Sequence, residues 1–334
     1  MNAAIDLVSF TRSLVDIDST TGREGEAGAW LARELRERGY DVTEQPVSSG
    51  RVNLLARVSD APLVVFSTHY DCVPPFFPSR EEGGLLFGRG ACDAKGILAA
   101  QVAAAERLRA AGETRVALLF VVGEERGSDG ARVANQQAPA SVRHLVNGEP
   151  TENRLGAATR GVLRVRLHAQ GRAAHSAFPE LGDSAIDKLL DALMVIRGLQ
   201  LPEDPLLGRT HHTVGVIEGG VAPNVVSAKA SAEVLFRIVG DAAPVREALA
   251  VVEGLVSIEH VLEVPAVRLQ TLPGFETAVF AYTTDVPLLT NWGAPLLIGP
   301  GSIHVAHTDE EHVLIDELQQ AVELYEKLAR HLLH

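Results

Sequence analysis

The 334-residue chain exceeds the size at which one hydrophobic core keeps growing, so its length predicts about two domains. Its net charge of -13, from 43 acidic and 30 basic side chains, disfavours binding to nucleic acid or anionic lipid. No apolar run is long enough to span a membrane, and the N-terminus lacks the basic start and apolar stretch of a secretory signal. Because it has only two cysteines, Cys72 and Cys92, we expect a reducing, cytoplasmic setting.

The first part of the chain predicts alternating helices and strands. Helices are expected over Ala3–Val15 and Glu24–Arg38, with a turn of small polar residues between them. An alanine-rich helix over Ile97–Ala111 interrupts a series of short β-rich runs. These runs are Val52–Val58, Pro62–Thr68, Arg115–Val122 and His144–Asn147. The alternation predicts an α/β domain with a mostly parallel, mixed sheet sandwiched by helices.

The pattern changes at Gly161 to a βαββαβ order. Strands are expected at Val162–Ala169, Thr213–Ile217, Ala228–Ile238 and Ile258–Leu262, and helices at Ser184–Arg197 and Ala243–Glu253. This order predicts an inserted α+β domain of ferredoxin-like type over 159–264. The first domain then resumes, with a helix or strand at Thr277–Tyr282, a strand at Leu296–Ile298 and a final amphipathic helix over Ile315–Leu333. The larger domain is therefore expected to comprise 1–158 and 265–334.

Metal-ligating side chains follow several of the predicted strands. Loops at the carboxyl ends of parallel strands are where such folds place their sites. His69 and Asp71 end one apolar strand and face the same side, so Asp71 could hold the imidazole while His69 offers its other nitrogen to a metal. A glycine-rich turn from Gly88 to Gly96 could bring Asp93, whose short carboxylate can bridge two cations, into a crowded centre.

Three further segments complete the set. Glu124 and Glu125 end the strand that begins at Arg115, and paired carboxylates beyond a buried strand are costly unless a cation neutralises them. One would bind metal and the other would act on water. Glu149 follows the next strand, and His307 lies in a late glycine-containing loop. Each feature alone is weak, since most acidic pairs are solvated and most histidines are not ligands, but their order along the chain is informative.

Together these motifs resemble the family of zinc-dependent deacylases and exopeptidases that includes acetylornithine deacetylase, acetyl-lysine deacetylase, succinyl-diaminopimelate desuccinylase, aminoacylase and glutamate carboxypeptidase. Three features carry the resemblance. The first is a motif in which His69 and Asp71, separated by any residue, are followed after one more residue by Val73 and Pro74. The others are the Gly88–Gly96 segment and the pair Glu124 and Glu125. The Gly148–Thr151 turn and the Gly299–His307 segment complete them and look closest to the acetylornithine and acetyl-lysine deacetylase branch. The resemblance implies a fold of the di-zinc exopeptidase type with a lid domain.

The resemblance also implies a role for each matching residue. Two zinc ions would be held, one by His69 and Glu149 and the other by Glu125 and His307, with Asp93 between them. Nitrogen and oxygen donors without thiolates suit zinc and would also accept cobalt or manganese.

The implied catalytic and substrate-binding residues are distributed over both expected domains. Glu124 would act as general base with Asp71 in support, and His175, of the inserted domain, would stabilise the oxyanion from the same or a partner subunit. The residues expected to bind substrate are Asn224, Arg237 and Gly301.

The leading functional hypothesis is hydrolysis of a small-molecule N-acyl amino acid of the acetylornithine, acetyl-lysine or acetylcitrulline type. Desuccinylation and dipeptidase or carboxypeptidase action are the enzymatic alternatives. A non-catalytic metal-binding scaffold is a further alternative, although such a chain should show broken ligands. The resemblance also implies a homodimer formed through the inserted domain, and neither nucleic acid nor membrane is expected as a partner.

Overall fold

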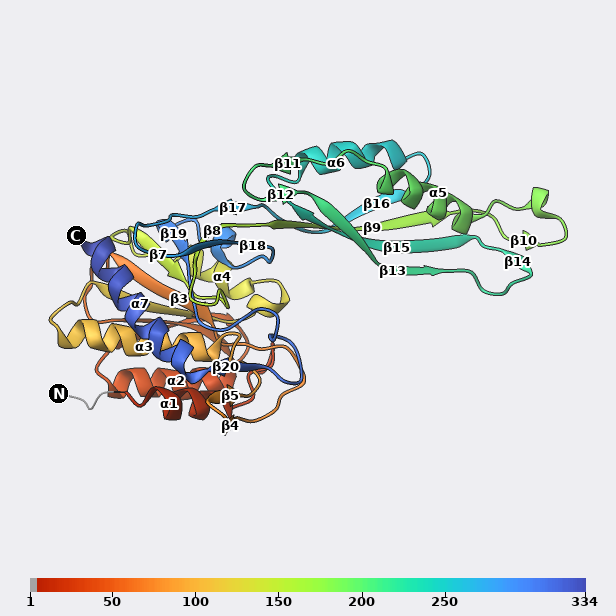
Figure 1. Cartoon of the computed structure of the whole chain (residues 1–334). Helices are drawn as coiled ribbons and strands as arrows, with labels where there is room; N and C mark the ends of the chain where they lie inside the picture. Colours follow the sequence, from red (N-terminus) through yellow and green to blue (C-terminus); the bar gives the residue numbers. More distant parts are fainter. Residues whose placement is uncertain (1–4) are drawn as a thin grey trace. The chain divides into compact units, whose positions relative to one another are not determined.

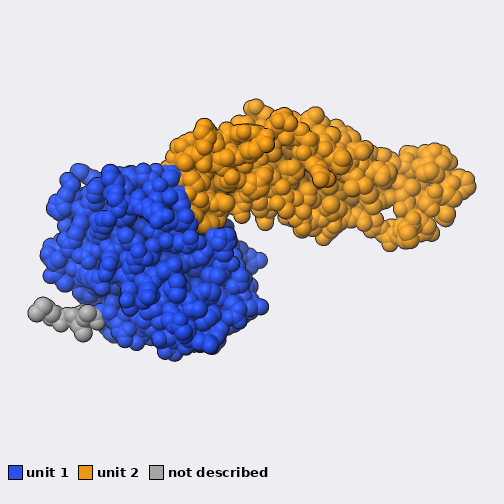
Figure 2. Space-filling model, viewed as in Figure 1, with its two compact units in different colours: residues 1–157, 269–278, 284–334 blue, residues 158–268, 279–283 orange. Residues whose placement is uncertain are grey.

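The computed structural model describes residues 5–334, so the start of the first expected helix, Ala3 and Ala4, lies outside the described residues. The chain divides into two compact units, one formed by 1–157, 269–278 and 284–334 and the other by 158–268 and 279–283 (Figure 2). No helix among the described residues has the length and apolar character needed to cross a membrane.

A six-stranded sheet organises unit 1. Its strands are β1 (Asp41–Ser48), β2 (Arg51–Arg57), β3 (Val64–His69), β6 (Val116–Val121), β7 (His144–Asn147) and β19 (Ala294–Leu297). They lie in the order β1-β2-β6-β3-β7-β19. The four strands from β6 to β19 are parallel, whereas β1 and β2 add an antiparallel edge. The expected mixed, mostly parallel sheet is therefore confirmed.

Helices cover both faces of this sheet. They are α1 (Leu7–Val15), α2 (Gly25–Glu37), α3 (Lys95–Ala110), α4 (Asp129–Asn135) and α7 (Ile315–Leu333). Side chains of β3 alternate between two cores: Phe66 joins the core with α1, α2, α3 and α7, while Val65 joins the core that includes α4. All six residues of β3 are buried, including the polar Ser67, Thr68 and His69 at its carboxyl end, so the strand has no alternation of buried and exposed positions.

The helix α3 is buried around most of its circumference, which is possible because many of its core positions are alanines. Small side chains let a helix approach the sheet and its neighbours closely. The turn before α3 is thereby placed beside the carboxyl ends of the parallel strands, and it carries Asp93. The final helix α7 buries one stripe, including Leu318, Val322 and Tyr325, at the spacing of an amphipathic helix.

Unit 2 is an antiparallel sheet with helices. Its main elements are β9 (Gly161–Gln170), α5 (Ala185–Arg197), β13 (His211–Gly219), β15 (Lys229–Ile238), α6 (Ala243–Leu249) and β16 (Ser257–Val264). The sheet order is β13-β15-β9-β16, and the chain order is the expected βαββαβ. Alternate residues of β9 and β15 are buried, and both helices lie on that face (Figure 1). Ser184 caps α5 by accepting a hydrogen bond from the Asp187 amide at 3.2 Å.

The remaining elements are short. They are β4 (Arg80–Glu82), β5 (Leu85–Phe87), β8 (Leu155–Thr159), β10 (Ala174–His175), β11 (Glu203–Asp204), β12 (Gly208–Arg209), β14 (Val225–Val226), β17 (Val267–Arg268), β18 (Thr277–Phe280), β20 (His312–Leu314) and the 3-10 turns η1 (Glu124–Arg126), η2 (Pro179–Leu181), η3 (Ala250–Val252) and η4 (Val286–Leu288). They form the small sheets β20-β5-β4 and β17-β8-β18 and the pairs β10-β14 and β11-β12.

Candidate metal centre and active site

The candidate site lies where the four parallel strands of unit 1 end. Since β6, β3, β7 and β19 are neighbours and run in the same direction, their carboxyl ends share one edge of the sheet. His69 is the last residue of β3, the pair Glu124 and Glu125 follows β6 in η1, Glu149 follows β7, and His307 lies in the loop after β19. Chain segments far apart in sequence thus supply side chains to one edge.

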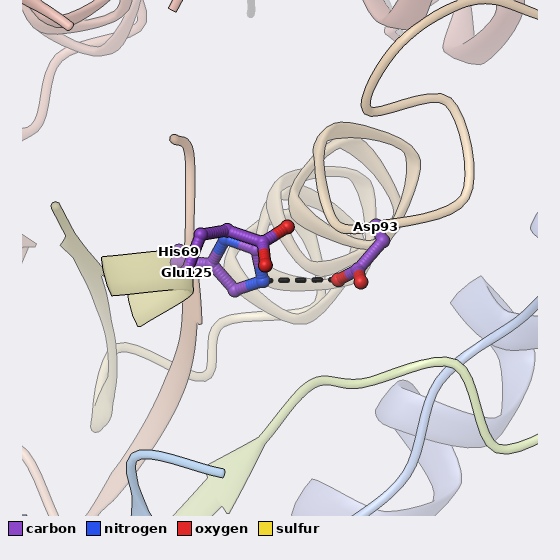
Figure 3. Close-up of side chains that lie close together, drawn as sticks. All are labelled: His69, Asp93 and Glu125. Carbon is purple, nitrogen blue, oxygen red and sulfur yellow. Dashed lines mark hydrogen bonds and ion pairs between the residues drawn. The ribbon is translucent and has the colours of Figure 1, made fainter. Parts of the chain in front are cut away.

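Asp93 lies between the two histidines. Its Oδ1 is 3.0 Å from Nε2 of His69, and its Oδ2 is 3.3 Å from Nε2 of His307. The same nitrogen of His307 is 3.0 Å from Oε1 of Glu125. Figure 3 shows His69, Asp93 and Glu125, whose potential ligand atoms all lie within 4.8 Å of one another. One carboxylate therefore faces two imidazoles, as a bridging ligand would.

A tight turn carries Asp93 to this position. Gly88 and Gly90 have φ values of 145° and 89°, and a Cβ on Gly90 would lie 2.7 Å from the sulfur of Cys72. A side chain there would be both strained and sterically blocked. The Asp93–Ala94 peptide bond is cis, and α3 begins at Lys95.

Asp71 connects His69 to the turn with the paired glutamates. Its carboxylate accepts hydrogen bonds from the backbone amides of Glu124 at 3.1 Å and Glu125 at 3.3 Å, and from the hydroxyl of Thr21 at 2.8 Å. Nδ1 of His69 is 3.6 Å from this carboxylate and 3.0 Å from the backbone oxygen of Asp71. Asp71 therefore lies against the imidazole and also holds the backbone of η1.

The histidine and aspartate ionisations reflect these contacts. Burial disfavours the charged imidazolium, but hydrogen bonds with Asp71 and Asp93 outweigh it and raise the pKa of His69 well above its usual value. Hydrogen bonds with Asp93 and Glu125 raise the pKa of His307 to about 10. Burial opposes ionisation of Asp93, yet its hydrogen bonds with His307 and His69 hold its pKa below the usual range.

The other carboxylates repel one another. Burial, followed by the charge of Glu149, raises the pKa of Glu124 well above its ordinary value. Burial likewise raises the pKa of Glu149, with Asp93 and Asp285 adding to the effect. Burial raises the pKa of Glu125 as well. This concentration of buried negative charge is costly without a cation.

The residues fit a metal ion on two further counts. Oε1 of Glu149 is buried and accepts no hydrogen bond, so it retains a free donor pair for a cation. All the candidate ligands offer imidazole nitrogen or carboxylate oxygen, the donors that suit zinc, cobalt and manganese. Both cysteines are buried, and burial raises the pKa of Cys72 to about 12, so its thiol is not a favourable ligand.

Three of the expected site residues belong to unit 2. His175 in β10 is exposed, and its Nδ1 accepts a hydrogen bond from the Ala177 amide at 3.1 Å, which leaves Nε2 as the protonated donor of a neutral imidazole. The backbone oxygen of Asn224 accepts from the Ser176 amide at 3.0 Å, so the loops of His175 and Asn224 are adjacent. Arg237 in β15 is half-buried and, among the described residues, has no carboxylate partner.

Gly301 has a structural reason to be glycine. Its φ is 82°, and a Cβ would lie 2.5 Å from the sulfur of Cys92. Its amide donates to Oε2 of Glu317 at 3.2 Å. The loop that leads to His307 is therefore packed closely on the turn that carries Asp93.

Sequence reasoning missed several polar residues around the site. Thr21 contacts Asp71, and Glu311 contacts the Asp93 turn. Asp285, at the start of η4, is buried near the same charged cluster, and burial raises its pKa to about 6. Only the three-dimensional contacts distinguish these residues from ordinary surface acids and hydroxyls, so no sequence pattern marked them.

Comparison with solved structures identifies the fold class of the protein. A tripeptidase of Staphylococcus aureus has a structure similar to this chain with a TM-score of 0.82 and 20% identity, covering 98% of this chain and all of that one. At this identity the likeness establishes the fold, an α/β unit with a mostly parallel sheet and an inserted α+β unit.

Sequence comparison then gives the family. The chain matches Peptidase family M20/M25/M40 over residues 65–331. It is 36% identical to a peptidase M20 domain-containing protein of Schizosaccharomyces pombe, covering 98% of this chain and 84% of that protein. It is 38% identical to a probable carboxypeptidase of Aspergillus fumigatus, covering 97% of this chain and 86% of that protein. The chain therefore belongs to the M20/M25/M40 peptidase family and is a hydrolase that acts on amide or peptide bonds.

Proposed function

We propose that this protein is a metal-dependent exopeptidase that releases a C-terminal amino acid from a dipeptide or other short peptide. The observation that carries the proposal is the similarity, over nearly the whole chain, to probable carboxypeptidases. The clustered histidines and carboxylates at the sheet edge supply the chemistry that such hydrolysis needs. A dipeptide and an N-acyl amino acid share the same amide bond next to a free carboxylate, so one site can serve either class.

Two metal ions, in our proposal zinc, are held by the five clustered ligands. His69 and Glu149 would hold one ion and Glu125 and His307 the other, and Asp93 would be available to both. The support is the position of the Asp93 carboxylate between both imidazoles and the unpartnered oxygen of Glu149. When bound, such ions lower the pKa of a shared water and polarise the amide carbonyl.

The protein's own residues then move protons and stabilise charge. Glu124 removes a proton from the attacking water and returns it to the leaving amine, a role supported by the raised pKa of its carboxyl group, to which the charge of Glu149 contributes. Asp71 fixes the backbone of Glu124 and Glu125. The family resemblance assigns His175 to the oxyanion, and the protonated Nε2 inferred above is the donor this role requires. The resemblance likewise assigns Asn224, Arg237 and Gly301 to substrate binding.

Deacetylation of an N-acetylated basic amino acid is the second candidate. The Gly299–His307 segment, which resembles the acetylornithine and acetyl-lysine deacetylase branch, favours it. Desuccinylation requires an additional cation for the extra carboxylate. The candidates for it, Arg172 and Arg209, are exposed and contact the Leu181 backbone oxygen and Glu203, respectively. The carboxypeptidase hypothesis takes precedence because relatives with 37% and 38% identity over nearly the full chain carry that name.

A substrate panel tests the proposal. The purified protein, supplied with zinc or cobalt, is incubated with dipeptides, N-acetylornithine, N-acetyl-lysine, N-acetylcitrulline and succinyl-diaminopimelate, and free amine is measured. We expect the highest kcat/KM for a dipeptide. A higher value for an acetylated amino acid would transfer the assignment to the deacetylase, and no turnover on any substrate would reject both.

We further propose that the protein forms a homodimer through unit 2. The strand β13 is an edge strand with exposed Val216 and Ile217, which are 46% and 58% accessible. The helix α5 exposes Leu190 and Met194 at 50% and 65%. Apolar side chains on an unpaired edge and a helix favour burial against a second copy. We also propose a cytoplasmic location, because both cysteines are free thiols.

A further inference from the structure

The carboxylate of Glu311 lies at the centre of the turn that carries Asp93. Its Oε1 accepts hydrogen bonds from the backbone amides of Gly90 at 2.9 Å, Cys92 at 3.2 Å and Asp93 at 3.0 Å. The side chain is fully buried. Three amides that converge on one oxygen form a backbone anion site, which in this protein is filled by its own side chain.

The second oxygen of Glu311 is held by a buried cation. Nη1 of Arg89 donates to Oε2 at 2.6 Å, and Nε of Arg89 donates to the backbone oxygen of Pro75 at 3.1 Å. Arg89 is only 1% exposed, and its guanidinium lies over the ring of Phe77. The ion pair therefore joins the loop after Asp71 to the Asp93 turn and to the segment after His307.

These contacts restrict the backbone freedom of the turn that carries Asp93. Gly88 and Gly90 give it backbone freedom, yet Asp93 must present its two oxygens to His69 and His307 at the same time. Because Glu311 is only four residues beyond His307, it connects the backbone of the bridging carboxylate directly to the segment of the second histidine. The backbone oxygen of Glu311 also accepts from the Gly88 amide at 3.1 Å, at the start of the turn.

We propose that Glu311 is a positioning residue that preorganises Asp93 and couples it to His307, and that this arrangement sets the affinity of the centre for its metal ions. The inference rests on the proposed metal-dependent function. Outer residues that orient metal ligands contribute about 10- to 100-fold to metal affinity. Glu311 acts through Asp93 and does not contact substrate.

The test compares metal affinity in Glu311→Gln with two matched controls. Glu310→Gln removes the adjacent charge, which pairs with Arg80 at the surface. Leu35→Ala truncates a fully buried core residue in α2 and so reports on lost stability alone. Each metal-free protein is titrated with Co²⁺ in competition with a chelator, and the visible spectrum of bound cobalt reports the ligand geometry.

We expect Glu311→Gln to weaken Co²⁺ binding at least about tenfold and to alter the cobalt spectrum. The Co²⁺ affinity of each control should remain within about threefold of that of the unmodified protein, a margin near the usual error of additivity between independent sites. The inference would be overturned if Glu311→Gln bound Co²⁺ as tightly as the unmodified protein. It would also be overturned if Leu35→Ala lost as much Co²⁺ affinity as Glu311→Gln. If the unmodified protein bound no metal, the proposed function would fail instead, so the two failures are distinct.

A second measurement needs no variant. Hydrogen exchange of residues 88–94 is compared between metal-free and metal-loaded unmodified protein. If Glu311 holds the turn in advance, the amides of Gly90, Cys92 and Asp93 should be protected before metal binds, and metal should slow their exchange less than about tenfold. Fast exchange of these amides in the metal-free protein would contradict preorganisation.

Discussion

Glu124 and Glu125 are adjacent in sequence and differ in their contacts. Glu125 contacts His307 at 3.0 Å, whereas the electrostatic environment of Glu124 is dominated by burial and by Glu149. This difference supports a ligand role for Glu125 and a proton-transfer role for Glu124. The two glutamates therefore provide an internal comparison between loss of a base and loss of a ligand.

Replacing Glu124 with Gln should remove the base and retain its size. We expect kcat to fall by about 10²- to 10⁴-fold with the metal content unchanged, because the amide cannot accept the proton from water. The matched variant Glu125→Gln should instead lower the metal content. Steady-state kinetics and elemental analysis measure both effects, and Glu124→Gln with more than a tenth of the original kcat would remove Glu124 from the proposed role.

Asp285 should make the metal-free protein less stable as the pH rises. Its ordinary pKa of 3.8 applies to the unfolded chain, and burial raises the folded value to about 6. Between these values the unfolded state loses the proton first, so folding stability declines with pH until both states are ionised. The full penalty is on the order of 3 kcal/mol above pH 6, at about 1.4 kcal/mol per pH unit.

The variant Asp285→Asn should therefore stabilise the metal-free protein at pH 8 and have little effect near pH 4. Urea unfolding of both proteins at the two pH values measures the difference. A stabilisation that does not grow with pH would show that the buried carboxylate is not the cause. Bound cations should reduce the benefit of the substitution, since they offset the same repulsion.

The sequence pointed to the residues at strand ends but not to those that hold them. His69 and Glu125 follow apolar strands, a pattern visible in one dimension, and the structure brings them together. Glu311 and Gly90 are 221 residues apart, and their hydrogen bond depends on the complete fold. Burial of a charged residue is decided by such long-range contacts, which is why Glu311 and Asp285 were not predicted.

A network of charged residues lies beside the turn between β6 and α4. Arg51 in β2 donates to both oxygens of Glu24 and pairs with Asp129 at the start of α4. Glu24 is fully buried, and its Oε2 also accepts from the Gly22 amide at 2.7 Å. The network connects the loop between α1 and α2 to the element that follows the paired glutamates.

Replacing Arg51 with Met should leave the buried Glu24 without its cation. We expect the free energy of unfolding to fall by about 3 to 5 kcal/mol, the usual cost of breaking a buried ion pair on one side. Arg36→Met is the matched control, because Arg36 pairs with Glu44 on the surface, and it should change stability by less than about 1 kcal/mol. Equal effects in chemical denaturation would contradict the role assigned to Arg51.

Periodicity identified the buried elements better than the exposed ones. The expected run His144–Asn147 coincides with β7, and the expected final helix coincides with α7. The edge strand β1 was not predicted, because it is mostly exposed, rich in polar residues and contains Pro46. The ambiguous Thr277–Tyr282 segment contains the strand β18, since a short apolar run has no distinguishing period.

For the whole molecule, the dimer proposal predicts that charge on the exposed edge of unit 2 disrupts association. Ile217→Lys on β13 and Met194→Asp on α5 should each raise the dissociation constant at least about tenfold, because burial of an unpaired charge at an interface is costly. Val58→Lys replaces an exposed apolar residue of unit 1 and should have no effect. Light scattering over a dilution series measures the mass, and a monomer at every concentration of the unmodified protein would reject the dimer.

The distribution of ligands along the chain has a consequence for biosynthesis. His69, Asp93, Glu125 and Glu149 all precede unit 2 in sequence, whereas His307 follows it. A nascent polypeptide therefore lacks His307 until unit 2 has been synthesised, so the proposed centre cannot be complete before that point. On this assignment, hydrolytic activity requires that the intervening unit has already been made.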